Sequence, residues 1–375
     1  MQKKPSLVLF LGAGFSKGLW DDIPLASGLT KAILHELEQH PHHRRDLESL
    51  ILRLFPDLKD PAQVDFETFL GLLDGLCKDR DLAARLDIPD PDRQWDTVVS
   101  GLGRAVHRSK RYSKYLAYPP LESLIRILQA LEQRYAVSVI TTNYDLIADT
   151  ACFYVNDAPH GKDDVRLNLD RYRYGIHIRG LCQIQSQSVT GGGAVDRSRF
   201  VGTPPPRPAA GGISVYKLHG SLNWAFCETC HEIDLAFSKS ELQSIYGWRP
   251  VPCAADCGGT YKRLIIPPQP SKVFSNYELV KVWKRAETVL SAAAFAVFIG
   301  FSLNPIDAPV IQMILRARAI SKRSGGGAWA YGLVNPDASL PARYRSLLGE
   351  PAIQVVQPFS PASFESRILP RLLSR

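Results

Sequence analysis

A short apolar run followed by glycines, Leu7 to Ser16, constrains the fold of this chain more than any other stretch. Five consecutive apolar residues lead directly into Gly12-Ala13-Gly14-Phe15-Ser16. A short run that is apolar throughout is typical of a parallel strand covered on both faces. Glycines behind such a strand permit a tight turn and let a phosphate approach the backbone N–H groups. The stretch therefore predicts a buried strand that ends at a nucleotide phosphate.

This stretch departs from the dinucleotide-binding fingerprint of dehydrogenases. That fingerprint is G-x-G-x-x-G, and Lys17 stands where its third glycine belongs, with Gly18 one residue later. We therefore expect a nucleotide-binding domain that is not an ordinary dehydrogenase domain.

Length and composition favour a globular protein of one large domain or two modest ones. The chain has 375 residues, of which 45% are hydrophobic. Its longest apolar run, Ala292 to Ile299, has eight residues, whereas a transmembrane helix needs about 18. The apolar run behind the basic N-terminus is too short for a secretory signal. We therefore expect a cytoplasmic protein with no membrane partner.

The formal net charge of the chain is +8, and its densest basic run covers residues 107–114. Tyrosine is interleaved with the basic residues there, so the run is a candidate contact for nucleic acid or for an acidic partner. A solvated helix face is the simpler interpretation.

Helical patterns fill the range 27–133, between the first two predicted strands. Apolar residues recur at helical spacing over 31–39, 47–54, 64–76, 97–106 and 121–131. Pro41 is expected to end the first of these helices, and the next is expected to begin at Leu47. We interpret 27–133 as a helical insertion that caps the nucleotide site.

Polar side chains follow the second predicted strand, 135–141. Thr142, Asn143 and Asp145 come directly after it, and the carboxyl ends of parallel strands open into the ligand crevice of an α/β sheet. A helix cap explains one such side chain but not three. We therefore assign them to a functional site.

Later strands end in the same way and complete the predicted sheet. His219 follows the strand 215–218, Gly300 and Ser302 follow 294–299, and Asn335 follows 329–334, with a last strand near 353. Six strands with intervening helices predict a doubly wound, Rossmann-like parallel α/β sheet. Residues 185–212 contain three consecutive glycines and three consecutive prolines and are expected to form a flexible loop.

Four cysteines predict a small metal module over residues 225–262. Cys227 and Cys230 form a C-x2-C pair, Cys253 and Cys257 form a C-x3-C pair, and 22 residues separate the pairs. This spacing is typical of a structural zinc ribbon, in which a closed four-thiolate site staples the chain and binds no water. Four free thiols are the alternative, since disulfides are disfavoured in a cytosolic chain.

Taken in order, these motifs resemble those of the sirtuin superfamily. Its members carry Gly-Ala-Gly-x-Ser, Thr-x-Asn-x-Asp, His-Gly, a four-Cys zinc module, Gly-x-Ser and a late Asn, and all six stand in this chain. The resemblance implies a single sirtuin-type NAD-binding domain over residues 1–375. Protein-deacylating sirtuins follow the serine with Gly-Ile-Pro-Asp-Phe-Arg, whereas this chain has Leu19-Trp20-Asp21-Asp22-Ile23-Pro24-Leu25. In this departure, and in its large helical block, the chain is similar to the bacterial sirtuin-like NAD hydrolases of antiphage defence.

The resemblance also implies a role for each motif. Gly12, Ala13, Gly14, Phe15 and Ser16, with Thr142, would bind the NAD pyrophosphate side. Catalysis would fall to Asn143, Asp145 and His219. Gly300, Ser302 and Asn335 would hold the adenosine half. Asn143 can orient water or a ribose hydroxyl, and a histidine that titrates near neutrality can act as a general base.

The function expected from the sequence is therefore NAD⁺ glycohydrolase activity that yields nicotinamide and ADP-ribose. A protein deacylase and a non-catalytic NAD or ADP-ribose sensor are the alternatives. The family further suggests a homo-oligomer with low basal activity and a separately encoded partner such as a HerA-type ATPase.

Overall fold

The structure is a computed structural model that describes residues 4–107, 119–153, 174–185, 199–203, 212–236, 251–268, 277–324 and 328–374. Apart from His107, the basic run 107–114 lies outside these residues, as does most of the range 185–212. Inside that range, β4 (Arg199–Thr203) is a strand. No helix among the described residues is both long enough and apolar enough to cross a membrane.

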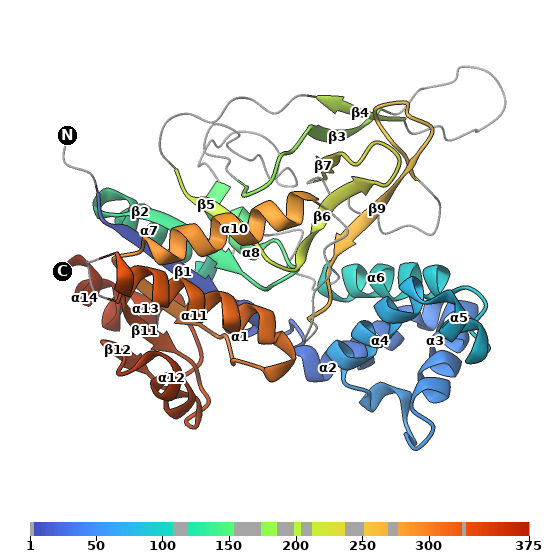
Figure 1. Ribbon diagram of the computed structural model, residues 1–375, viewed down its shortest axis with the longest axis horizontal. Coiled ribbons are helices and arrows are strands. Elements are labelled where there is room, and N and C mark those ends of the chain that lie inside the picture. Colours follow the sequence, from blue (N-terminus) through green and yellow to red (C-terminus); the bar gives the residue numbers. More distant parts are fainter. Residues whose placement is uncertain are drawn as a thin grey trace.

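A parallel sheet of six strands forms the centre of the protein and confirms the predicted doubly wound architecture (Figure 1). Its strand order is β12-β11-β10-β1-β2-β5. The strands are β1 (Ser6–Leu11), β2 (Ala136–Thr141), β5 (Ser214–Lys217), β10 (Phe295–Ile299), β11 (Ala330–Val334) and β12 (Ile353–Val355). Strands β2 and β5 lie on one side of β1, and the later strands β10, β11 and β12 lie on its other side. The strand order therefore reverses between β1 and β10, and in such sheets ligands bind at this point.

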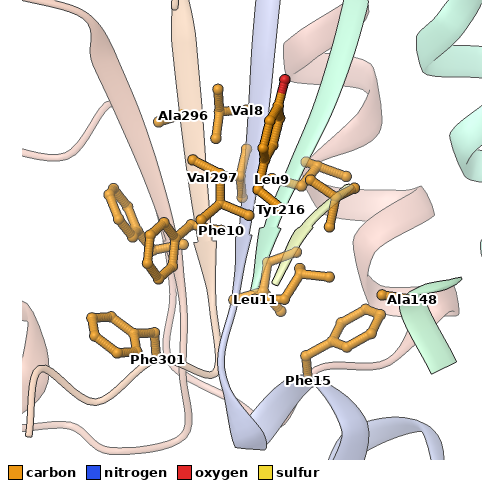
Figure 2. Close-up of a cluster of buried hydrophobic side chains, with 14 of the residues drawn as sticks. Val8, Leu9, Phe10, Leu11, Phe15, Ala148, Tyr216, Ala296, Val297 and Phe301 are labelled. Atoms are coloured by element: carbon orange, nitrogen blue, oxygen red, sulfur yellow. The ribbon is translucent and has the colours of Figure 1, made fainter. Parts of the chain in front are cut away.

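The apolar run of β1 is buried on both faces of the sheet, as its composition predicts. Leu9 pairs in register with Val297 of β10 and with Val139 of β2. Side chains of a strand alternate between the two faces. Figure 2 shows Phe10 beside Phe301 on one side of β1, with ring centroids 5.0 Å apart, and Phe15 on the other.

Helices cover both faces of this sheet. They are α7 (Pro119–Arg134), α8 (Ile147–Phe153), α10 (Tyr277–Ser291), α11 (Ala308–Arg323), α12 (Leu340–Leu348), α13 (Pro361–Arg367) and α14 (Leu369–Leu373). The helices α10 and α11 pack together, while α7 packs against α8, α13 and α14. Leu124 and Leu128 of α7 belong to the same hydrophobic core as β1. Thus α7, at the end of the range 27–133, is part of the main domain core.

A second sheet contains strands that come before and after β5 in the sequence. Its order is β4-β3-β7-β6-β9-β8. The remaining strands are β3 (Gly180–Gln185), β6 (Gly220–Cys227), β7 (Ile233–Leu235), β8 (Val251–Pro252) and β9 (Thr260–Ile265). The pairs are antiparallel except for β3 with β7. All four cysteines of the predicted metal module lie on this sheet or its connections.

The helices from α2 to α6 build a second hydrophobic core. They are α2 (Ala26–Glu36), η1 (Leu37–Gln39), α3 (Pro41–Leu54), η2 (Pro61–Gln63), α4 (Phe66–Lys78), α5 (Arg80–Arg85) and α6 (Pro91–His107), and Figure 1 shows them gathered on one side of the molecule. Asp65 caps α4 by accepting a hydrogen bond from the backbone N–H of Thr68 at 2.8 Å. Side chains of β6 and β9, such as Leu222 and Ile265, lie in the same core.

Candidate functional site

Backbone hydrogen bonds join the strand ends at the point where the strand order reverses. The N–H of Gly12 donates to the carbonyl of Ile299 at 2.9 Å, and that of Gly14 donates to Gly300 at 3.1 Å. On the other side, the N–H of Thr142 donates to Leu11 at 3.1 Å. Three of the predicted polar strand ends therefore meet at one edge of the sheet.

The glycine-rich stretch forms the start of a short helix, α1 (Ala13–Leu19). Ala13 is exposed and Gly14 half-buried, so the backbone at the start of α1 is accessible to a ligand. Phe15 is 2% exposed, and its ring lies 5.0 Å from that of Phe359. The Phe15 side chain therefore belongs to the core and leaves only its backbone for a ligand.

A hydrogen-bond network connects the first two strand ends through Asn143. The side-chain amide of Asn143 donates to the carbonyl of Gly12 at 3.0 Å and to Oγ of Ser16 at 2.9 Å. Ser16 in turn donates to Oδ2 of Asp145 at 2.6 Å. Both amide protons are thus used, and Oδ1 accepts no hydrogen bond from the described part of the chain. The network fixes an acceptor oxygen at the sheet edge.

Asp145 supports this network through its own hydrogen bonds. Its side chain is buried and also accepts a hydrogen bond from the N–H of Ile147 at 3.0 Å. Burial raises the pKa of Asp145, and the nearby Lys217 ammonium and the Ser16 hydroxyl oppose that rise. The contacts of Asp145 make it a residue that orients Ser16 and Asn143.

A buried ion pair also stabilises the loop that carries Asn143 and Asp145. Lys217 of β5 and Asp149 of α8 are both fully buried, and Nζ of Lys217 lies 2.8 Å from Oδ2 of Asp149. Lys217 also donates to the carbonyl of Asp145, and Asp149 accepts a hydrogen bond from the Tyr174 hydroxyl. The sequence analysis missed this pair, although a lysine in a strand otherwise expected to be buried was an available signal.

His219 lies at the third strand end and contacts a carboxylate. Its Nε2 is 3.1 Å from Oδ1 of Asp307, and both side chains are buried. The ring of Tyr144 lies 6.0 Å from the His219 ring, centroid to centroid. The histidine thereby neighbours the loop that carries Asn143. Sequence reasoning also missed Asp307, since nothing in the sequence pairs it with a residue 88 positions earlier.

The remaining predicted residues lie at the ends of β10 and β11. Ser302 is exposed, and Asn335 is 8% exposed. Oδ1 of Asn335 accepts a hydrogen bond from the N–H of Asp337 at 3.0 Å, which closes a turn. The roles of Ser302 and Asn335 toward a ligand remain predictions.

Gly300 occupies a position that only glycine fits. Its φ is +63°, and a Cβ there would lie 2.3 Å from the backbone N of Phe15. We expect Gly300→Ala to lower the free energy of unfolding by about 1–3 kcal/mol or more, because a residue with a side chain is strained in the left-handed backbone conformation. Urea denaturation measures this loss. The control is Gly75→Ala in α4, where a Cβ meets nothing within 4 Å and a gain of about 0.5–1 kcal/mol is expected. Equal effects of the two substitutions would contradict this assignment.

The four cysteines converge and fit a tetrahedral metal site. Their sulfur atoms all lie within 4.8 Å of one another, with Sγ of Cys227 3.5 Å from that of Cys257 and Sγ of Cys230 3.8 Å from that of Cys253. Four thiolates at the Zn–S bond length are roughly 3.8 Å apart. The donor set therefore fits Zn²⁺, which would supply a structural cross-link here.

Arg179 is a further residue of this module that the sequence did not reveal. Its guanidinium lies 3.6 Å from Sγ of Cys253 and pairs with the buried Asp234. It also donates to the Tyr261 hydroxyl at 3.0 Å. A cation beside the thiolates offsets part of their negative charge.

Comparison with known proteins gives matches among solved structures alone. No protein-family model matches the sequence, and no curated protein matches it. A Sir2 structure with a p53 peptide and NAD⁺ is 13% identical, covers 99% of this chain and 93% of its own, and has a TM-score of 0.41. A mutant Sir2 homologue with ADP-ribose has the same identity and coverage and a TM-score of 0.45. TM-scores below 0.5 do not establish a shared fold, so the interpretation of the site rests on its own geometry.

Proposed function

We propose that the protein is an NAD⁺ glycohydrolase, which cleaves the bond between nicotinamide and ribose and releases nicotinamide and ADP-ribose. The observation that carries this proposal is the orientation of Asn143. Its two amide protons bind Gly12 and Ser16, which turns the remaining oxygen into a fixed acceptor beside the glycine-rich stretch. Such an oxygen suits the positive charge that develops on the ribose carbon as nicotinamide leaves.

The chemistry needs positioning more than strong acid catalysis. Nicotinamide leaves NAD⁺ as a neutral molecule, so the leaving group needs no proton. The reaction is accelerated by fixed dipoles facing the developing cation and by a water held in line with the breaking bond. Asn143 supplies the dipole, and His219 supplies a base that accepts the proton of the attacking water. Ala13 at the start of α1, together with Ser302 and Asn335, would hold the rest of NAD, because the N–H groups of Gly12 and Gly14 already donate to the carbonyls of Ile299 and Gly300.

We also propose that this activity belongs to a regulated effector of bacterial antiphage defence. The support is the resemblance of the sequence, with its large helical block and no Phe-Arg after Ser16. An unregulated NADase would deplete its own cell, so we expect low basal turnover. Self-assembly into a homo-oligomer, or a partner such as a HerA-type ATPase, would then raise it.

Incubation of the purified protein with NAD⁺ alone, and then with each candidate partner, tests these proposals. Chromatographic detection of nicotinamide and ADP-ribose without any added peptide is the expected result. Release of nicotinamide only when an acyl-lysine peptide is present would instead identify a deacylase. Binding of NAD⁺ without turnover under every condition would identify a sensor.

A further inference from the structure

The contact between His219 and Asp307 assigns a role to a residue that no motif includes. Nε2 of His219 lies 3.1 Å from Oδ1 of Asp307, and the two side chains are 4% and 7% exposed. A carboxylate beside an imidazole away from water favours the protonated, positively charged form of the ring. The contact is an electrostatic one, since its geometry is not that of a hydrogen bond.

Local structure holds the Asp307 carboxylate in place. Asp307 ends the short turn η5 (Pro305–Asp307), which follows β10 and begins at a proline. Its N–H donates to the carbonyl of Asn304 at 2.9 Å. The Asn304 side chain accepts a hydrogen bond from Ile306 at 3.2 Å and donates one to Glu67 of α4 at 2.9 Å. A turn that is fixed at both ends presents its carboxylate in one position.

The backbone of His219 and the neighbouring Tyr144 are fixed as well. The carbonyl of His219 accepts a hydrogen bond from the N–H of Ile266 at 2.8 Å, and the hydroxyl of the neighbouring Tyr144 donates to the carbonyl of Ile266 at 3.0 Å. Burial raises the pKa of Tyr144 well above its usual value, and the charges of Glu67 and Asp307 add to this rise. Tyr144 therefore stays neutral, and Asp307 is the carboxylate in contact with the ring.

We propose that Asp307 is the positioning residue of His219, and that its carboxylate stabilises the positive charge of the ring when the ring accepts a proton during the reaction. This inference rests on the proposed function. As the C1′–nitrogen bond breaks, its electron pair passes to the nicotinamide nitrogen. A water oxygen bonds to C1′, and one proton of that water passes to the imidazole of His219. The resulting imidazolium is stabilised by the Asp307 carboxylate, and its later loss of that proton to solvent restores the enzyme.

The test replaces the charge of Asp307 and follows His219 directly. NMR of the full-length protein without NAD reports the pKa of His219, whose signal is identified by its loss in His219→Gln. In Asp307→Asn we expect the His219 pKa to fall, because the ring loses the carboxylate that stabilises its charged form. Asp57→Asn, which changes an exposed carboxylate, is the matched control and leaves the His219 pKa unchanged.

Kinetics supply the second measurement. In Asp307→Asn we expect kcat for NAD cleavage to fall roughly tenfold to a hundredfold with little change in KM. The acid limb of its pH profile moves to lower pH, because the base loses its proton at lower pH. An unchanged pKa of His219 in Asp307→Asn would overturn the positioning role. A lowered pKa in a protein whose wild type cleaves no NAD would support the His219–Asp307 pair and overturn the proposed reaction.

Discussion

Asn143→Ala is expected to reduce the kcat for NAD cleavage on the order of 10²–10³-fold, as the loss of one oriented dipole does in other enzymes. The substitution removes the acceptor oxygen that Gly12 and Ser16 hold in place. Nicotinamide release under saturating NAD measures the effect. KM should change less than kcat, because the oxygen acts mainly on charge that develops in the transition state.

The fold should survive the loss of the Asn143 amide. Ser16 still donates to Asp145 at 2.6 Å, and each lost hydrogen bond costs about 0.5–1.5 kcal/mol. Gln312→Ala, which removes an exposed amide from α11, is the matched control and should retain wild-type turnover. Folding of each variant is checked by thermal denaturation. Wild-type turnover in a folded Asn143→Ala variant would exclude Asn143 from the reaction.

Lys217→Met is expected to give the largest loss of stability, about 3–5 kcal/mol, because it leaves the Asp149 carboxylate buried without its cation. Both side chains are fully buried and 2.8 Å apart. The double variant Lys217→Met with Asp149→Leu removes both charges and should recover part of that loss. Urea denaturation of the wild type and of the single and double variants measures this coupling.

An exposed ion pair provides the control for this experiment. Arg316 and Glu287 lie 2.9 Å apart, and the arginine side chain is 55% exposed. Arg316→Met should cost no more than about 1 kcal/mol. If Lys217→Met costs no more than Arg316→Met, the buried pair does not stabilise the fold as its burial suggests.

The sequence predicted the central sheet well because each of its strands leaves a local signal. Strands β1 and β10 are covered on both faces and therefore appear as unbroken apolar runs. Glycine or polar residues after each run marked the strand ends, and Gly12, Asn143 and Gly300 do meet at one edge. The four cysteines likewise converge as their spacing predicted.

Helix boundaries were predicted less well, and the cause is proline. Pro41 was expected to end one helix and leave the next to begin at Leu47, yet α3 begins at Pro41 itself. The first position of a helix needs no N–H donor, so proline both ends the preceding segment and starts the new one. A pattern of apolar residues cannot separate these two cases.

The partners of the site residues could not be predicted, because their pairing depends on tertiary structure. Lys217 meets Asp149 across 68 positions of sequence, and the pair forms only after β5 and α8 have packed. Asp307 contacts His219 in the same way. The aspartate follows β10 and the histidine follows β5, and these strands lie on opposite sides of the point where the strand order reverses. A charged residue in a buried strand indicates that a partner exists, but only the fold identifies it.

The helical insertion and the metal module fold around one shared core. Cys227 and Cys253 belong to the same hydrophobic cluster as Ile33 of α2 and Leu70 of α4, and so does Leu146. The next residue, Ile147, already belongs to the core of the main domain. A bound metal would therefore stabilise the packing of these helices as well as its own knuckles, because both belong to that core. The loop that carries Asn143 leads directly into Leu146 and Ile147, so it lies where the two cores meet.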